Sequence, residues 1–450
     1  MTRDATLVAD LDYVVTCDDG DTILTNASIL VEHGVIQAVG PRESLQQRAE
    51  EIGATVRSGA RRLAMPGLVN LHTHLSMTLL RGLAEGVDLQ GFLDKVWAAE
   101  AAVMDPPTVE LGARLAALEA LTGGTTTTLD MYLHPQAAHT GASALGLRHV
   151  TGPIFFDGPG PDGLTWDRRL DSLTEWRAYV ATAPGPVIPL AAFPHATYTT
   201  SPAHLAELRE AMCDNTFGLL HTHASETTAE NEEIRARYRC TPVEVLVDAG
   251  FLDSDVDVVL GHGVHLSRSD RATLAEAHAA VAHCPGSNLK LASGALNWRT
   301  CRGSGVRLGI GTDGCSSSND LDMWQAMRQA ALLARLTSGH PEAAPATEIL
   351  RAATIEGARA LGLGDTTGSL EVGKRADLVL IDLDAPHLTP VHDVPALLVF
   401  AAGRGDVDTV LVDGQVVVDA HRSTRVDAAE LLSVCRERAA YAKTAADSES

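Results

Sequence analysis

Two histidines, His72 and His74, flank a single threonine directly after the mostly apolar run 68–71. Side chains alternate along an extended strand, so residues two apart point to the same side and both imidazoles can reach one ion. The chain contains 18 histidines, so a His-x-His pair also arises by chance. The pair therefore predicts half of a metal site, and the prediction depends on finding further ligands elsewhere in the fold.

Composition indicates a large folded protein. The 450 residues are 45% hydrophobic, which predicts one large domain and a smaller one. The formal net charge of −23 disfavours binding to nucleic acid or to an anionic membrane. We expect a cytoplasmic protein, because the sequence shows neither a signal peptide nor a membrane-spanning apolar run. Its seven cysteines are scattered without a Cys-x-x-Cys pair, which argues against disulfides and thiolate metal sites.

Short strands with turns are expected at both ends of the chain. Alternating patterns predict strands at 10–16, 27–32 and 35–39 near the N-terminus, and at 376–383 and 409–419 near the C-terminus. Turns are predicted at His33-Gly34 and Asp413-Gly414. We expect residues 1–64 and 365–450 to form one composite β-sandwich domain that also carries a C-terminal helix.

The middle of the chain alternates short apolar strands with helical patterns, as in βα units of a parallel sheet. Predicted helices cover 107–121, 202–212, 242–249, 268–278 and 321–335. Eight strands are predicted, at 67–71, 125–129, 149–155, 187–192, 218–221, 258–260, 280–283 and 306–310. An α/β fold with a (β/α)₈ TIM barrel over residues 65–364 follows, with its active site at the C-terminal ends of the strands.

Metal-binding and acid-base residue types follow most of these predicted strands. They are His72, His74, Asp130, His195, His223, Glu226, His262, His283 and Asp313. Each residue alone has a plainer interpretation: a core histidine for His195 or His283, a helix cap for Asp130 and a turn residue for Asp313. Their shared position favours a metal site, because barrel enzymes draw catalytic groups from several strand ends.

The donor types narrow the metal. Three imidazoles, a carboxylate and a water suit Zn²⁺ in an open catalytic site, although Fe²⁺ or Mn²⁺ can use the same set. A two-metal site in this architecture often needs a carboxylated lysine on a middle strand. No lysine lies between Lys95 and Lys290, so we expect one metal per subunit.

These motifs resemble the amidohydrolase superfamily in its mononuclear aminohydrolase branch. The residues that carry the resemblance are 66–74 (PGLVNLHTH), His223-x-x-Glu226, His262 and Thr312-Asp313-Gly314. A closer similarity, to the S-adenosylhomocysteine and 5′-methylthioadenosine deaminases, rests on 72–85 (HTHLSMTLLRGLAE), 130–132 (DMY), 287–291 (SNLKL) and 373–379 (GKRADLV). The match spans nearly the whole chain, and it is more specific for the superfamily than for the substrate.

The resemblance implies a hydrolytic deaminase that converts an adenosine-type nucleoside to its inosine analogue and ammonia. His72, His74, His223 and Asp313 would bind the metal, and His262 would hydrogen-bond the water activated there. Glu226 would protonate the ring nitrogen next to the attacked C6. Asp313 would move the proton of the water to the leaving amine. From position alone, Glu226 could instead be an acid at a helix N-terminus, because residues 227–235 look helical.

Substrate contacts follow from the same resemblance. His195 matches a ring-contacting histidine, and Glu100 matches a carboxylate that binds the ribose hydroxyls, which implies a nucleoside instead of a free base. Ser317 is four residues after Asp313 and would line the same pocket. Phe92 stands where the family often has a tryptophan near the sugar.

The binding of the 5′ substituent is the weakest part of the match. The arginine that the family uses for the homocysteine tail falls near Gly152-Pro153, so Arg168 or Arg169 would have to supply a cation. An unpaired carboxylate is costly to bury. We therefore expect adenosines with smaller or less acidic 5′ groups, such as 5′-methylthioadenosine, 5′-deoxyadenosine or adenosine, in preference to S-adenosylhomocysteine.

Two other functions stay open. One is hydrolysis of another amino- or chloro-heterocycle, such as guanine, cytosine or an s-triazine. The other is a non-catalytic relative that keeps the barrel for binding or assembly, which the intact set of metal and acid residues disfavours. We also expect a homo-oligomer with a small-molecule substrate.

Overall fold

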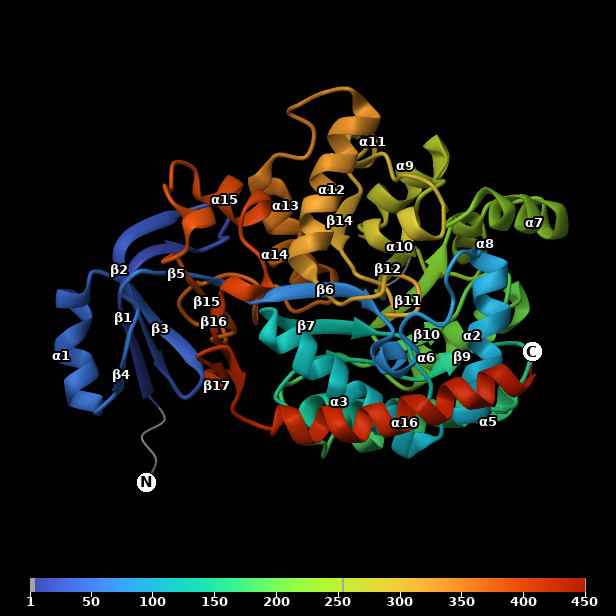
Figure 1. The fold of residues 1–450 in the computed structure, drawn as a ribbon. Helices are drawn as coiled ribbons and strands as arrows, with labels where there is room; N and C mark the ends of the chain where they lie inside the picture. Colours follow the sequence, from blue (N-terminus) through green and yellow to red (C-terminus); the bar gives the residue numbers. More distant parts are fainter. Residues whose placement is uncertain (1–4, 253–254, 450) are drawn as a thin grey trace.

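The computed structural model describes residues 5–252 and 255–449, in which parallel strands form two sheets flanked by helices (Figure 1). The first sheet contains β6 (Leu68–Thr73), β7 (Thr125–Asp130) and β8 (Arg148–Val150). The second contains β9 (Ile154–Phe155), β10 (Ala191–Pro194), β11 (Leu219–Ala224), β12 (Asp257–His262), β13 (Ala280–His283) and β14 (Arg307–Ile310). The expected α/β fold with parallel strands is confirmed.

Strands β14 and β6 lie side by side where the two sheets meet. The Asp313 amide donates to the His72 carbonyl at 2.9 Å, just beyond the end of β14. Asn70 and Thr312 exchange two hydrogen bonds at 2.7 and 3.0 Å. These contacts bring the C-terminal ends of the first and last parallel strands together.

Two of the predicted strands needed correction. The strand expected at 149–155 is broken at residues 151–153, because Pro153 has no N–H to donate and Gly152 packs against the Ala191 carbonyl. The strand expected at 187–192 instead begins at Ala191, after the proline-rich stretch 184–189. Proline cannot donate to a central ladder, which explains the late start.

Helices follow the strands, and several begin with a proline that fits the first turn. They are α2 (Leu89–Val103), α3 (Pro106–Thr122), α4 (Pro135–Ala144), α5 (Trp166–Val180), α6 (Pro202–Asp214), α7 (Thr228–Tyr238), α8 (Pro242–Asp248), α9 (Arg268–Glu276), α10 (Pro285–Lys290), α11 (Trp298–Gly303), α12 (Met323–Ser338), α13 (Ala346–Ala352) and α14 (Ile355–Ala360). The 3₁₀ helix η1 (Leu75–Leu80) directly follows β6. Within the described residues, no helix is long and apolar enough to cross a membrane.

Strands from both ends of the chain form one mixed sheet, in the order β18-β17-β16-β15-β5-β1-β2-β3 with β4 paired to β1. They are β1 (Ala5–Val15), β2 (Ile23–Glu32), β3 (Val35–Gly40), β4 (Thr55–Ser58), β5 (Arg62–Pro66), β15 (Leu378–Asp382), β16 (Val407–Val412), β17 (Gln415–Asp419) and β18 (Arg422–Ser423). The expected turns at 33–34 and 413–414 connect β2 to β3 and β16 to β17, with all four residues at positive φ. The remaining helices here are α1 (Arg42–Ile52), η2 (Pro386–Leu388), α15 (Val394–Phe400) and η3 (Arg404–Asp406).

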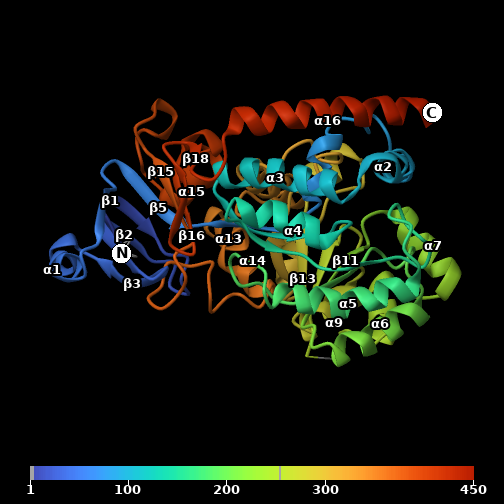
Figure 2. The same ribbon diagram turned by 90° about the horizontal axis from the view of Figure 1, so that it is seen from below.

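The terminal sheet and the parallel strands are joined by a buried cation. The guanidinium of Arg148, on β8, donates to Asp377 at 3.0 Å and to Asp413 at 2.7 Å. Helix α16 (Ala428–Glu449) then runs from the terminal sheet along α3 and α2 (Figure 2). The packing of α16 against α2 and α3 ties these helices to the terminal sheet.

Candidate metal centre and active site

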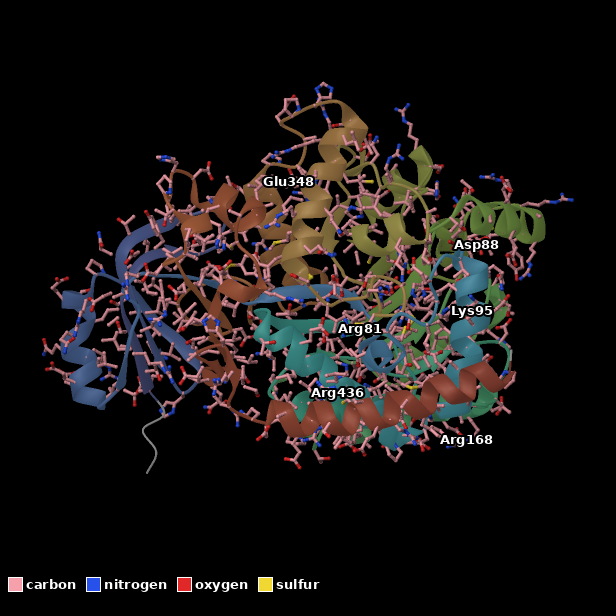
Figure 3. All side chains as sticks on the ribbon, in the orientation of Figure 1. Arg81, Asp88, Lys95, Arg168, Glu348 and Arg436 are labelled. Carbon is pink, nitrogen blue, oxygen red and sulfur yellow. The ribbon has the colours of Figure 1, made fainter. Side chains whose placement is uncertain are left out.

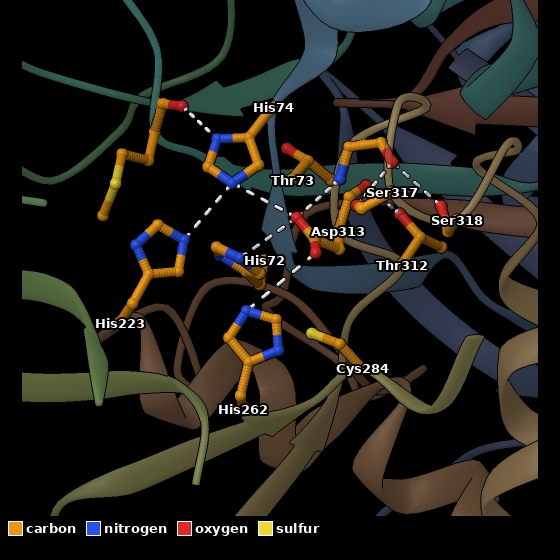
Figure 4. A network of polar contacts seen from close by, with 12 residues as sticks. His72, Thr73, His74, His223, His262, Cys284, Thr312, Asp313, Ser317 and Ser318 are labelled. Carbon is orange, nitrogen blue, oxygen red and sulfur yellow. Dashed lines mark hydrogen bonds and ion pairs between the residues drawn. The ribbon is translucent and has the colours of Figure 1, made fainter. Parts of the chain in front are cut away.

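Four buried side chains from three strand ends meet at one point (Figure 4). Nε2 of His74 lies 3.3 Å from Nε2 of His223 and 3.2 Å from Oδ1 of Asp313. Nε2 of His72 lies 3.5 Å from the same carboxylate oxygen. The structure therefore brings together the four residues expected to bind the metal.

The spacing of these donors fits a divalent metal ion. Ligands about 2.1 Å from one ion at tetrahedral angles are roughly 3.4 Å apart, which is close to the three separations observed. Nε2 of His72 is buried without a hydrogen-bond partner, although an unpaired buried polar atom is costly. A cation bound among the donors would satisfy that nitrogen, so these residues fit a bound metal ion.

Backbone carbonyls set the tautomers of two of these histidines. Nδ1 of His74 is 2.6 Å from the Met131 carbonyl, and Nδ1 of His223 is 2.7 Å from the His195 carbonyl. A carbonyl only accepts, so each Nδ1 carries the hydrogen. In the neutral ring, Nε2 is then left with a free lone pair that faces the centre.

The third tautomer is set through another histidine. Nδ1 of His221 donates to the Val259 carbonyl at 2.8 Å, so Nε2 of His221 must accept. That nitrogen lies 2.7 Å from Nδ1 of His72, which therefore donates and leaves its own Nε2 unprotonated. The contacts of His221 thus orient a metal-ligand candidate.

Burial and the carboxylate push the pKa values of the cluster in opposite directions. Burial lowers the pKa of His72 to about 4 and that of His223 well below its usual range. Burial also opposes the charged form of His74, but its contact with Asp313 raises that pKa to about 9. His72 and His74 hold the pKa of Asp313 well below its usual range, although burial alone would raise it.

Zinc affinity is therefore expected to depend on pH. With a pKa of about 9, His74 in the metal-free chain is protonated below that pH, so the metal must displace one proton. We predict that the logarithm of the association constant rises by about one per pH unit between roughly pH 6 and 8.5. Competition titrations with a zinc chelator will measure this slope. A pH-independent affinity over the interval would contradict the expected proton displacement.

Two more titratable groups face the centre. Nε2 of His262 lies 3.7 Å from Oε2 of Glu226 and 3.9 Å from Oδ2 of Asp313, while its Nδ1 donates to the Asn288 side chain at 2.9 Å. Burial raises the pKa of Glu226, so this acid keeps its proton to higher pH than a solvated carboxyl. Donor atoms of His72, His262 and Asp313 are also close enough to hold an ion, which makes His262 a geometric alternative to His223 as a ligand.

A cavity that is open to solvent lies over this cluster. One wall is a face of α2, which presents Phe92, Val96 and Glu100 at successive helical turns. Of the expected site residues, the cavity is lined by His74, Phe92, Glu100, His195, His223, Glu226, His262 and Asp313. It reaches from an apolar wall to the cluster of imidazoles and carboxylates.

Two polar groups on the cavity wall have clear partners. Glu100 is buried and accepts a hydrogen bond from the Tyr132 hydroxyl at 2.7 Å, and burial raises its pKa to about 7. The ring of His195 packs against Trp97 and Phe156, with centroids 5.5 and 5.2 Å away. A buried carboxyl group and an imidazole ring are therefore available beside the metal-ligand candidates.

Three expected substrate contacts do not reach this cavity. The Ser317 hydroxyl turns back to the Gly314 carbonyl at 2.9 Å. Arg168 is exposed on α5, far out on the molecule, where it pairs with Asp171 and Glu175 (Figure 3). The guanidinium of Arg168 lies outside the lining of this cavity in the structure, and its contact with substrate stays a prediction. Arg169 is also outside the lining, buried against Asp162 and backbone carbonyls.

Sequence reasoning missed several lining and supporting residues. Trp97 and Leu93 lie on the same helical face as Phe92 and Glu100, so a period of 3.6 would have placed them. Tyr132 belongs to the motif 130–132, but the motif does not reveal its contact with Glu100, which lies 32 residues away in the sequence. Asp130, considered as a helix cap, instead accepts from the Leu75 amide at 2.7 Å and from His149 at 2.8 Å.

Comparison with known families agrees with this geometry. Residues 63–417 match the amidohydrolase family, and the chain belongs to that family. The resemblance inferred from the sequence motifs is thereby confirmed.

Relatives with assigned activities cover most of the chain. A 5-methylthioadenosine/S-adenosylhomocysteine deaminase of Moorella thermoacetica is 40% identical over 385 residues, which cover 85% of this chain and 88% of the relative. A 5′-deoxyadenosine deaminase of Methanosarcina acetivorans is 37% identical over 432 residues, covering 95% and 96%. The crystal structure of an adenosine deaminase from Xanthomonas campestris with bound zinc has a TM-score of 0.92, 35% identity and 98% coverage of each chain.

Proposed function

We propose that this protein is a metal-dependent hydrolase that deaminates adenosine-type nucleosides to their inosine analogues. The observation that carries the proposal is a buried acid, Glu226, beside three imidazoles and a carboxylate at the end of a cavity. Relatives named as deaminases of 5-methylthioadenosine, S-adenosylhomocysteine and 5′-deoxyadenosine support the substrate class.

The finer architecture belongs to the same proposal. The parallel sheets form one (β/α)₈ barrel over residues 65–364, with β8 and β9 as two parts of its third strand. Contacts between β6 and β14 support this closure. Residues 1–64 and 365–450 make the composite β-sandwich domain, whose strands come from both ends of the chain. The homo-oligomer and the cytoplasmic location remain predictions.

One Zn²⁺ per chain is the proposed cofactor, held by His72, His74, His223 and Asp313. When bound, the ion supplies Lewis acidity that lowers the pKa of a water toward neutrality. Zinc in the related adenosine deaminase structure supports this choice over Fe²⁺ or Mn²⁺. The absence of lysine between Lys95 and Lys290 supports a single ion.

The remaining chemistry is proton transfer by three side chains. Burial raises the pKa of Glu226, which favours the protonated acid, and Glu226 donates this proton to the adenine ring nitrogen next to C6. Asp313 accepts one proton of the attacking water at a carboxylate oxygen and delivers it to the departing amine. The second proton of that water returns to Glu226 as the C6 carbonyl forms, which restores the acid. His262 orients that water from Nε2, because its Nδ1 is held by Asn288. The carboxylates and His262 are close enough to share one reacting centre.

The cavity wall defines the rest of the substrate. Glu100 accepts hydrogen bonds from the ribose hydroxyls, and Phe92 and His195 contact the sugar and the ring. Among the described residues that line the cavity there is no lysine or arginine. A carboxylate on the 5′ substituent would therefore lack a cation, so small neutral 5′ groups are preferred.

Glu226→Gln is expected to lower kcat by about a thousandfold or more, because an amide cannot donate the proton in the same way. His223→Ala removes a ligand and should lose the metal as well. Metal content by elemental analysis, measured beside ammonia release, separates the two effects. A near-normal kcat in Glu226→Gln would show that the proton comes from another group.

Nucleoside binding should weaken as pH falls through the pKa of Glu100, which is about 7. Below that pH Glu100 is protonated, and the neutral carboxyl can no longer accept hydrogen bonds from both ribose hydroxyls as strongly as the carboxylate does. We predict that KM rises by up to about tenfold per pH unit below roughly pH 6.5. Glu100→Gln should show a high KM without this dependence. The same pH dependence of KM in wild type and variant would contradict the role of Glu100.

An ammonia-release screen tests the function itself. Adenosines with hydrogen, hydroxyl, methylthio and homocysteinyl groups at C5′ should be compared with adenine, guanine, cytosine and an s-triazine. We expect the nucleosides with small neutral 5′ groups to rank first. A ranking led by a free base, or chloride release from a chloro-triazine, would favour a different heterocycle hydrolase. Inertness toward all of these rings, in a protein that retains no stoichiometric metal even after zinc is supplied, would favour a non-catalytic relative.

A further inference from the structure

The segment that carries Glu226 is held by a second buried acid on the following helix. Glu230 lies in the first turn of α7 and is only 4% exposed. Its Oε1 accepts from the Ser225 amide at 3.0 Å, and its Oε2 accepts from the Glu226 amide at 2.7 Å. One carboxylate thus spans two consecutive backbone amides of the loop after β11.

This contact differs from an ordinary helix cap. Thr227 caps α7 by accepting from the Glu230 amide at 3.1 Å. An acid at this position usually returns to the amide of the cap residue itself. Glu230 instead reaches past Thr227 to the two preceding amides, so its side chain does more than begin the helix. Burial raises the pKa of Glu230 to about 7, and the two N–H donors oppose that shift because they favour the anion.

The backbone that Glu230 holds has an uncommon conformation. Ser225 has φ of 53°, in the left-handed region that a non-glycine residue adopts at a cost. The Ser225 carbonyl is held as well, by the His265 amide at 2.9 Å. If the Glu230 carboxylate did not accept from the Ser225 and Glu226 amides, fewer interactions would stabilise this strained turn.

The orientation of Glu226 depends on this turn. Toward the protein, the Glu226 carboxyl has one neutral hydrogen-bond partner, the Ser293 hydroxyl at 3.2 Å, and it faces His262 on the other side. The position of the Glu226 carboxyl therefore depends largely on the conformation of the backbone turn that follows β11. A shift of about 1 Å at a reacting group can cost a hundredfold in rate.

We propose that Glu230 is a positioning residue that holds Glu226 in the geometry for proton donation, through its hydrogen bonds to the Ser225 and Glu226 amides. This role rests on the proposed deamination for its effect on rate. The hydrogen bonds themselves can be tested without turnover.

Glu230→Gln tests the role with little change in shape. The amide oxygen can accept from one backbone N–H, but its NH₂ group then faces the other N–H without an acceptor. We expect kcat to fall about tenfold to a hundredfold, with zinc still bound at one ion per chain. Affinity for a nucleoside analogue with a tetrahedral, hydroxyl-bearing carbon in place of C6 should fall in parallel, while affinity for the inosine-type product stays unchanged.

Glu233→Gln is the matched control. Glu233 lies one turn further along α7, is exposed, and pairs with Arg237 four residues later. The substitution removes the same charge from the same helix and should leave kcat and analogue affinity as in the wild type.

Amide exchange of the holoprotein decides the matter independently of activity. Glu230→Gln should speed hydrogen exchange at the Ser225 and Glu226 amides, and Glu233→Gln should not. The positioning role would be overturned if Glu230→Gln showed unchanged amide exchange or a normal kcat. It would also be overturned if the variant bound the analogue with normal affinity but at fewer sites per chain. If the wild type deaminates no adenosine, the proposed function fails, and the exchange result still shows whether Glu230 holds the turn.

Discussion

The site depends on hydrogen bonds made on the outer side of its histidines. Each Nδ1 that points away from the centre donates to an acceptor, either a backbone carbonyl or, for His72, the ring of His221. This arrangement leaves Nε2 lone pairs converging where a cation satisfies them. The capacity of the site to bind a metal ion follows from that constraint.

Parallel strands supply those acceptors in register. The carbonyls belong to Met131 after β7, His195 after β10 and Val259 within β12, each on a strand next to one that bears a histidine of this network. Neighbouring parallel strands end at the same edge, so one strand provides a ligand and the next fixes its tautomer. The terminal sheet acts further away, through Arg148 and α16, by fixing the elements around the cavity.

Much of this arrangement could be predicted from residue types and spacing. Strand periodicity placed His72, His74 and His223 at one edge, and the motifs around them identified the family. Side-chain contacts between distant segments could not be predicted in this way. Glu100 meets Tyr132 only through folding, Arg168 turns to acids on its own helix, and Pro153 breaks a strand that its apolar neighbours predicted. In each case a tertiary or local partner outweighs the one-dimensional pattern.

The central claim is that three outward-anchored imidazoles and one carboxylate hold a single ion. X-ray absorption spectroscopy of the zinc-loaded protein, with elemental analysis of the same sample, tests it most directly. We predict one zinc per chain, with three imidazole nitrogens at about 2.0–2.1 Å and oxygen in the remaining positions. His223→Ala should lose one of those nitrogens or the ion, and His262→Ala should lose neither. Two ions per chain, or loss of a zinc-bound nitrogen in His262→Ala, would contradict the account.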